Sequence, residues 1–410
     1  MKALGARYRA AYSTLPPGVQ LIGLQVWLPV LFVILFCFCY VFAFHAPSPH
    51  NVPVAVVGSS QAAADFASTL ESDSNGMFAV TLEPSLEAAQ TDVRSGDVAA
   101  AYVPAAAVPD DPGAPTAEVI VASAAQYQLS VLATQYFTPV AAAEGATLSV
   151  QDLAPLPPRD SFGTGLFYLT LVSLIGGYMI AMFVGLMGGP LKHRQRIGII
   201  AGFSLLLPLI STLLVRFVIG VVDQNFFAIW MIGAGTAFAV GLVVNGLSYF
   251  TGRFVTGLAL GLFVFINIPA SGGAFPPEFM PQPFEFLHPY VSATGTIDLL
   301  RETVYGVGPG LAAGWQILAG YAIVGAILTA IGKPYAERRA ARRAEKGMPI
   351  SMLASAQAAA AALAVAATPS SAGSDARNEG PGSEVDAGEA ETDDVETDTH
   401  SISAAVGSGV

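Results

Sequence analysis

The sequence predicts an α-helical polytopic membrane protein with six transmembrane helices and a small extracytoplasmic α/β domain inserted between helices one and two. Apolar residues make up 53% of the 410 residues and charged residues only 12%, whereas soluble proteins carry about 25% charged residues. Six apolar runs are long enough, or nearly so, to cross about 30 Å of hydrocarbon. Residues 45–160 lack such a run and alternate short strand-like and helix-like segments.

The first apolar run, residues 21–44, follows a short basic segment. Residues 1–20 carry Lys2, Arg7 and Arg9 and no acidic residue. This start is similar to a signal peptide, but the run exceeds the usual apolar region of about 7 to 15 residues and lacks a clear small-x-small cleavage site. We therefore expect a retained signal anchor, with residues 1–20 as a basic cytoplasmic N-terminus.

Residues 45–160 are expected to form the α/β domain on the far side of the membrane. The expected strands cover residues 54–57, 77–82, 98–103, 117–122 and 147–150, and the expected helices cover residues 61–70, 85–94 and 126–144. The region holds many acidic residues and, among basic ones, only Arg94 and Arg159, so its surface should be acidic. The net charge of -12 therefore gives no sign of a nucleic-acid-binding surface.

The other five spans form a membrane domain at residues 161–335. They are expected at residues 161–188, 197–222, 226–249, 252–270 and 311–332. Basic residues follow the second, fourth and sixth spans, and cytoplasmic loops are the ones enriched in Lys and Arg. We therefore expect a multi-pass protein of the plasma (cytoplasmic) membrane with both termini in the cytoplasm. Residues 333–410 should be a tail that is basic, then Ala-rich, acidic and disordered.

An extracytoplasmic re-entrant loop, residues 271–310, is expected between spans five and six. Its many prolines remove backbone donors, so the sequence predicts irregular or short re-entrant structure without a long helix. Gly272 and Gly273 permit backbone angles that other residues avoid, and the Phe residues suit a membrane interface.

Few polar residues fall inside the predicted spans. No acidic residue does, which argues against a proton relay built on intramembrane carboxylates. Arg216 lies well inside the third span, where it can extend to the outer headgroups or pair with Asp223 or a lipid phosphate. Asn245 and Asn267 are predicted to form hydrogen bonds between helices rather than to contact a substrate.

Motifs for enzymatic chemistry are missing from the sequence. It has no G-x-x-x-x-G-K-[ST], no G-x-S-x-G and no H-E-x-x-H, and its five histidines are scattered. Cys37 and Cys39 lie within the first apolar run, where cysteine behaves as a small apolar residue. We therefore predict no catalytic residue, no metal site and no cofactor, and a protein that is not an enzyme.

The expected arrangement resembles the phage-infection-protein (YhgE/Pip) branch of the type-2 ABC-exporter permease superfamily. In this arrangement one span is followed by an extracytoplasmic α/β domain and then by five clustered spans. The most specific similarity is an S-G-G-x-F-P…P…P…R signature before the last span. Here it consists of Ser271, Gly272, Gly273, Phe275, Pro276, Pro281, Pro289 and Arg301. Residues 51–57 and 94–104 are also similar to the family's ectodomain, and the resemblance covers residues 20–335.

The resemblance implies a permease-like subunit of an ABC-type exporter for an amphipathic or envelope substrate, with ATP hydrolysed by a separate subunit. It further implies a homodimer or a pair with a related half. The apolar spans predict contact with membrane lipids, and the charge distribution predicts no nucleic-acid partner. The signature residues would form an exit cap on the substrate path, either by shaping it or by touching the substrate.

Contact with the ATPase is expected on the cytoplasmic side. The candidates are Lys192, Arg194 and Arg196, and residues 1–20 and 337–346 are alternatives. The loop at residues 189–196 is short, however, whereas exporter permeases are expected to place a coupling helix there. The alternative function is a non-transporting cell-envelope scaffold or receptor whose α/β domain binds a partner.

Overall fold

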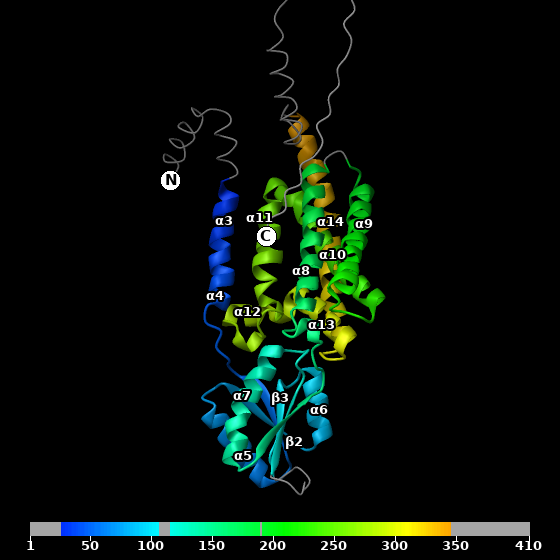
Figure 1. Ribbon diagram of the computed structural model, residues 1–410. Coiled ribbons are helices and arrows are strands. Elements are labelled where there is room, and N and C mark those ends of the chain that lie inside the picture. Colours follow the sequence, from blue (N-terminus) through cyan, green and yellow to red (C-terminus); the bar gives the residue numbers. More distant parts are fainter. Residues whose placement is uncertain (1–25, 106–114, 189–190, 346–410) are drawn as a thin grey trace, which may run out of the picture. The chain divides into compact units, whose positions relative to one another are not determined.

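The computed structural model describes residues 26–105, 115–188 and 191–345 and contains long apolar helices and a small α/β domain (Figure 1). The expected cytoplasmic N-terminus, the first residues of the first span and the Ala-rich and acidic part of the tail lie outside the described residues.

The α/β domain is built on a five-stranded mixed sheet with the order β2-β1-β3-β4-β5. The strands are β1 Val52–Val57, β2 Phe78–Glu83, β3 Ala100–Val103, β4 Thr116–Val121 and β5 Thr147–Asp152. The helices are α5 Gln61–Asp73, α6 Leu86–Ser95 and α7 Tyr127–Ala143. Only β3 and β4 pair antiparallel. The predicted alternation of strands and helices is confirmed, with element ends shifted by at most three residues.

Helices cover both faces of this sheet, and the strand sequences explain why. A strand that is buried on both faces is expected to be a continuous apolar run, and Val54, Ala55 and Val56 of β1 are fully buried. One face packs against α5 and α7, where Phe137 stacks on Tyr102 with ring centroids 4.6 Å apart. The other face packs against α6.

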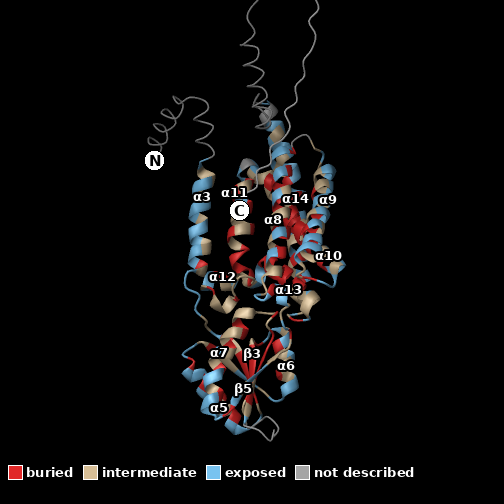
Figure 2. Ribbon diagram, viewed as in Figure 1, coloured by how far each residue is buried: buried red, intermediate tan, exposed pale blue. Residues whose placement is uncertain are grey.

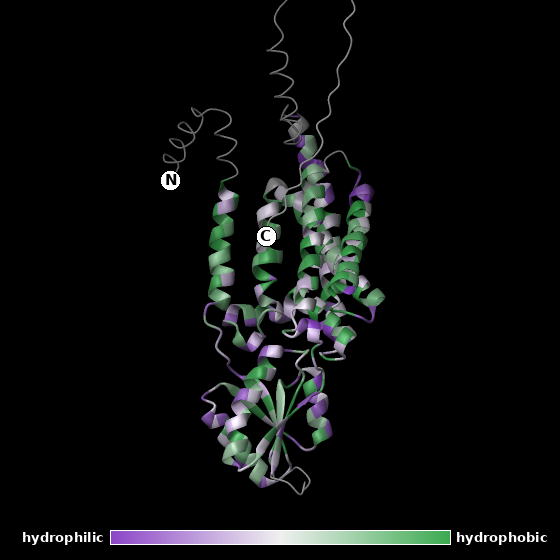
Figure 3. Ribbon diagram, viewed as in Figure 1, coloured by the Kyte–Doolittle hydropathy of each residue, from purple (hydrophilic) through white to green (hydrophobic). Residues whose placement is uncertain are grey.

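Five described helices are long and apolar enough to cross a membrane. They run over Trp27–Phe44, Gly165–Met187, His193–Ile219, Phe226–Thr251 and Leu311–Arg342. Two of them are composite: the first consists of α3 Trp27–Phe36, η1 Cys37–Val41 and α4 Phe42–Phe44, and the third consists of α9 His193–Leu213 and η4 Leu214–Ile219. The other three are the single helices α8 Gly165–Met187, α10 Phe226–Thr251 and α14 Leu311–Glu345. Figure 3 shows apolar residues along most of their length.

The fifth predicted span, residues 252–270, is a shorter apolar helix, Val255–Ile266, composed of α11 Val255–Leu260 and η6 Gly261–Ile266. At 1.5 Å per residue it covers about 18 Å, less than the roughly 30 Å of a hydrocarbon core. It is bounded by Gly252, which has a positive φ of 56°, and by the turn that begins at Pro269. A membrane crossing by this segment stays a prediction.

Helix α10 is the most buried of the long helices (Figure 2). It packs against α8, α9 and α14. Helix α3 instead packs against the short helix: Tyr40 donates a hydrogen bond to the Val264 carbonyl at 3.0 Å, and Phe32 and Phe265 meet edge to face.

The loop expected at residues 271–310 contains more helix than predicted. It continues from η7 Pro269–Ser271 into η8 Pro277–Phe279, α12 Gln282–Leu287, η9 His288–Tyr290 and the 14-residue helix α13 Ser292–Tyr305. The expectation of structure without a long helix is wrong for α13. The last proline before it is Pro289, so α13 keeps all its backbone donors, and it buries Ile297, Leu299 and Leu300.

Candidate functional site

The Ser-Gly-Gly turn at residues 271–273 has a steric requirement for both glycines. Gly272 has a φ of +71°, and a Cβ placed on it would lie 2.6 Å from Cε1 of His288. A Cβ on Gly273 would collide with the ring of Phe167 on α8. Ser271 closes the turn, since its Oγ donates to the Ile268 carbonyl at 2.7 Å and accepts from the Gly273 N–H at 3.2 Å.

Helix α7 of the α/β domain docks on this turn through two side-chain amides. Nε2 of Gln126 donates to the Gly272 carbonyl and Nε2 of Gln128 donates to the Ala274 carbonyl, both at 3.0 Å. On the membrane-helix side, Phe275 packs against Phe44 at the end of the first apolar helix, with centroids 5.3 Å apart. The predicted signature therefore lies where the α/β domain meets the membrane helices.

Two further contacts attach the α/β domain to the connecting segment, which we define as residues 267–310. Val307 is fully buried in the cluster formed by the α6 face of the sheet, and the N–H of Gly308 donates to the Arg94 carbonyl at 2.8 Å. The backbone N–H of His50 donates to the Glu278 carbonyl at 3.0 Å, and its ring lies 3.3 Å from the Glu285 carboxylate. The α/β domain thus holds the connecting segment near Glu278 and again near Gly308.

The membrane helices hold α13 through buried polar groups. Oδ1 of Asn267 accepts from the Ala293 N–H at 2.8 Å, which satisfies one backbone donor at the start of α13, and from the Ser292 hydroxyl at 3.1 Å. The hydroxyls of Thr236 on α10 and Thr296 on α13 lie 2.8 Å apart. The predicted hydrogen bonding of Asn267 is present, and α13 contacts α8, α10 and α14.

A polar cavity of about 250 Å³, the junction cavity, lies between α13, η8 and the α/β domain. Its charged and polar lining includes Asp97, Gln126, Glu278, His288, Asp298 and Arg301. Among the described residues, Arg301 has no hydrogen bond or ion pair, and Oε2 of Glu278 is buried without a partner. Buried polar groups are normally hydrogen-bonded, so the unpartnered oxygen of Glu278, together with the half-buried Arg301, makes the cavity a candidate binding site.

Burial shifts the pKa values of the groups in the junction cavity. It raises the pKa of Asp298 to about 6, against the opposing effect of Arg301. It also raises the pKa of Glu278 and lowers the pKa of His288. His288 is therefore neutral near pH 7, while a guanidinium such as that of Arg301 stays charged. Clustered pKa shifts of this kind are typical of functional sites.

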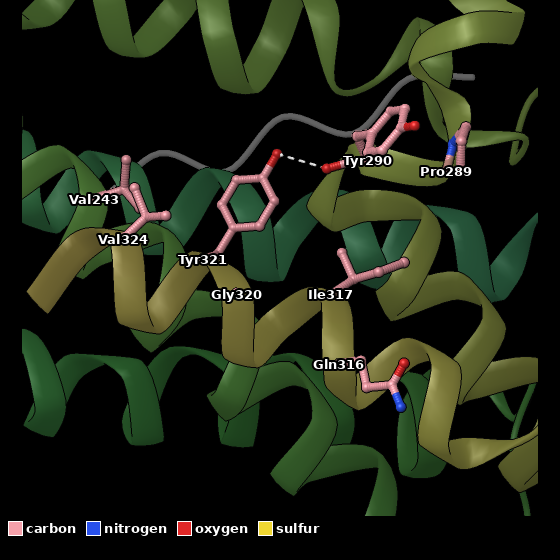
Figure 4. A pocket seen from close by; sticks show the side chains of 8 residues that line it. All are labelled: Val243, Pro289, Tyr290, Gln316, Ile317, Gly320, Tyr321 and Val324. Carbon is pink, nitrogen blue, oxygen red and sulfur yellow. Dashed lines mark hydrogen bonds between the residues drawn. The ribbon is translucent and has the colours of Figure 1, made fainter. Parts of the chain in front are cut away.

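A second hollow, the apolar groove, has a volume of about 360 Å³ and lies between α10, α14 and η9 (Figure 4). Its lining consists of Val243, Pro289, Tyr290, Gln316, Ile317, Gly320, Tyr321 and Val324. The Tyr321 hydroxyl donates to the Tyr290 carbonyl at 3.2 Å and ties α14 to η9. Gly320 leaves the groove open, since a Cβ there would meet nothing within 4 Å.

The turn η9 contributes to both hollows. His288 lines the junction cavity, and the next two residues, Pro289 and Tyr290, line the apolar groove. Sequence reasoning pointed to Pro289 and Arg301 but missed the α14 side of the groove. A signal was present in the polar Gln316 and the pair Gly320-Tyr321 within an otherwise apolar span.

Other predicted residues have local roles. Pro276 and Pro281 directly precede η8 and α12, where a missing backbone donor costs nothing. Arg216 lies over the rings of Phe217 and Phe226, at 5.5 and 5.9 Å, and forms no ion pair with Asp223. Arg216 lines neither the junction cavity nor the apolar groove.

Asn245 links two membrane helices, as predicted for it. Its Nδ2 donates to the Thr329 hydroxyl of α14 at 3.2 Å, while within the described part of the chain its buried Oδ1 has no partner.

The candidate ATPase contacts differ in exposure. Arg196 donates to the Gly188 carbonyl from Nε and Nη2, at 3.1 and 2.7 Å, and lies over the Tyr249 ring, so it stabilises the end of α8. Lys192 and Arg194 are exposed.

Asp160, which the sequence reasoning did not single out, caps α8. Its carboxylate accepts from the backbone N–H groups of Thr164 and Gly165, at 2.9 and 2.8 Å. A carboxylate in this position is favoured both by the free N–H groups and by the helix dipole. Its place just before an apolar run was the available signal.

These features define a multi-pass membrane protein in which an α/β domain, a polar cavity and an apolar groove share one connecting segment. A family model described as an ABC-2 family transporter protein matches residues 20–331. No curated protein and no solved structure matches the chain. Because the family match covers most of the chain, the protein belongs to the ABC-2 transporter family, whose members are membrane components of transporters. The superfamily part of the resemblance is thereby confirmed.

Proposed function

We propose that the protein is the permease subunit of a plasma-membrane ABC exporter that moves an amphipathic or envelope substrate and relies on a separate ATPase subunit. The observation that carries this proposal is the pair of hollows on the two sides of η9. One is apolar and borders the membrane-spanning α14, and the other is polar and borders the α/β domain. A substrate with an apolar chain and a polar head has a complementary surface in each.

The orientation proposed for the protein rests on the distribution of basic residues. Lys192, Arg194 and the basic end of α14 lie in the cytoplasm, and the α/β domain and α13 lie outside. The two hollows then belong to the outer side of the membrane, where an exported amphiphile leaves the helices. The signature at residues 271–276 supports a place in the phage-infection-protein branch.

ATP must be supplied by a partner in this proposal, since the chain carries no phosphate-binding motif. The exposed Lys192 and Arg194, at the start of α9, are the proposed contact with that partner. We propose a homodimer, or a pair with a related half, as the working assembly.

The test is to purify the tagged full chain together with candidate ATPase subunits and to measure ATP hydrolysis in nanodiscs. We expect one ATPase to copurify and to be stimulated by the chain. Replacing Lys192→Glu and Arg194→Glu together should lower both signals several-fold. Arg94→Glu, an equal reversal at an exposed arginine of the α/β domain, should leave them unchanged.

The opposing outcome is that no ATPase copurifies and none is stimulated. That result would favour the second candidate, a cell-envelope scaffold or receptor. The second candidate would then be tested with residues 45–160 expressed alone, since a fragment that reproduces the phenotype of the full chain would show a receptor function of the α/β domain.

A further inference from the structure

We infer that the junction cavity binds a zwitterionic head group, with an anionic group on Arg301 and an ammonium group on Glu278. The inference deepens the proposed export function, on which it rests, by assigning a chemical class to the polar end of the substrate.

The argument begins with two groups of opposite charge that lack partners. Arg301 lines the cavity without a hydrogen bond or ion pair to any described residue. Oε2 of Glu278, on the η8 side of the same cavity, is buried and equally unpaired among the described residues. Leaving the buried Glu278 oxygen unsatisfied costs free energy, whereas the half-buried guanidinium of Arg301 has a free hydrogen-bonding capacity. One ligand with both charges would pair with the two groups together.

The surrounding charges exclude a ligand with a single sign. A purely anionic head would approach Arg301 but would also lie among the carboxyl groups of Asp97, Glu278 and Asp298. A purely cationic head would suit those carboxyl groups but would lie close to the guanidinium. A zwitterion can place each charge opposite its complement, and this electrostatic matching is the basis of its selectivity.

The size and surroundings of the cavity also fit this class. Its volume of about 250 Å³ exceeds that of a single water, roughly 30 Å³ in the liquid, several-fold. His288 is neutral and its Nδ1 lies 2.9 Å from the Ala270 carbonyl, so Nδ1 carries the hydrogen and Nε2 is an acceptor. An ammonium group would find this acceptor in addition to the carboxylates.

The apolar groove indicates the source of the head group. Pro289 and Tyr290 follow His288 directly and line the groove. An acyl chain in the groove would therefore place its head beside η9. A lipid with a phosphate and a primary ammonium group, such as phosphatidylethanolamine, combines these features. A soluble zwitterion such as an amino acid offers the same head chemistry without the chain.

The test is isothermal titration calorimetry on the full chain in detergent. The probes are short-chain phosphatidylethanolamine, short-chain phosphatidic acid as the anion alone, and an alkylamine as the cation alone. We expect the zwitterion to bind about tenfold tighter than either single-charge probe. O-phosphoethanolamine is a fourth probe: weak binding assigns the site to a lipid head, and equal binding assigns it to a soluble zwitterion. Both outcomes support the zwitterion site.

The variants separate recognition from stability. Arg301→Gln should weaken binding of the zwitterion and the anion about tenfold or more and should strengthen binding of the amine, because it removes a like charge. Glu278→Gln should weaken binding of the zwitterion and the amine and should strengthen binding of the anion, because it removes a like charge. The matched controls are Arg94→Gln and Glu87→Gln, which make the same changes at exposed positions of α6.

Two results would overturn the inference. One is a parent protein that binds phosphatidic acid or the alkylamine as tightly as the zwitterion. The other is a pair of variants that lose affinity for all three probes equally or for none, which would assign Arg301 and Glu278 a structural role. Because the assay contains no ATPase and no ATP, either result leaves the transport test above unaffected.

Discussion

At the scale of single residues, Gly272 shows how a backbone conformation and a close contact combine at the site. The residue has a positive φ, which L-residues other than glycine rarely adopt, and it also has no room for a side chain beside His288. Gly306, at the end of α13, has a similar φ of +66° but open space around it. Comparing substitutions at the two glycines therefore separates the cost of backbone strain from the cost of steric exclusion.

Gly272→Ala is expected to destabilise the protein more than Gly306→Ala does. Both changes cost about 1 kcal/mol because alanine must adopt a left-handed backbone, but only Gly272→Ala also displaces the His288 ring. We expect an additional cost of about 1–2 kcal/mol, measured as the difference in melting temperature of the two purified variants. Equal melting temperatures would mean that the contact with His288 is unimportant.

Asp298 should make stability depend on pH. Burial raises its pKa to about 6 from an ordinary value of 3.8, so the folded state holds a proton that the unfolded state has lost. This contribution is complete below about pH 4 and is lost as the pH rises through about 6. Its upper limit is about 3 kcal/mol, from roughly 1.4 kcal/mol per pH unit.

The variant Asp298→Asn removes this titration. Relative to the parent, its melting temperature should rise between pH 4.5 and pH 7.5, because only the parent ionises a buried carboxyl group in that interval. Subtracting the parent at each pH cancels the other acidic groups. A difference that stays constant with pH would show that Asp298 keeps an ordinary pKa.

At the scale of elements, the connecting segment from Asn267 to Gly310 determines how the α/β domain is attached. Helix α7 holds it through Gln126 and Gln128, and the membrane helices hold it through Asn267 and Thr296. A displacement of α13 would therefore change the junction cavity and the contacts of α7 at once.

Replacing Gln126→Ala and Gln128→Ala together should loosen this attachment. Each lost hydrogen bond costs about 1 kcal/mol, and we expect faster amide hydrogen exchange at residues 271–276 with little change inside the sheet. The control is Gln90→Ala, which removes a bond to Gln151 within the α/β domain. Unchanged exchange at residues 271–276 would contradict docking through these amides.

The apolar groove on α14 can be closed without disturbing its neighbours. Gly320→Phe places a large side chain where a Cβ meets nothing, and Gly202→Phe does the same on α9, away from the groove lining. We expect both proteins to fold, and only Gly320→Phe to lose more than about tenfold in transport of an amphiphile. Equal transport by the two variants would remove the groove from the substrate path.

At the scale of the whole molecule, the sequence predicted the chain's organisation because its signals are strong and local. Long apolar runs marked α8, α10 and α14, and alternating short patterns marked the sheet and its helices. Helix α13 was not predicted because the prolines in the first half of residues 271–310 indicated irregular structure for the whole segment. Its amphipathic pattern was the weaker signal.

The site was predicted only in part, for a physical reason. The signature residues were identified individually, but a cavity depends on contacts between segments far apart in the chain. Glu278 of η8 and Arg301 of α13 line one cavity, and Val243 of α10 and Tyr321 of α14 line the other hollow. No pattern of spacing along one segment reveals such pairs.

The most direct measurement is ATP-dependent movement of an acyl-labelled amphiphile in proteoliposomes that contain the chain and its copurified ATPase. A quencher that does not cross the membrane reports which leaflet holds the label, and probes with zwitterionic, anionic and cationic heads are compared. We predict that ATP moves the zwitterionic probe between leaflets and that Gly320→Phe abolishes this movement. An equal distribution with and without ATP, or the same movement in liposomes that lack the chain, would contradict its role as an exporter permease.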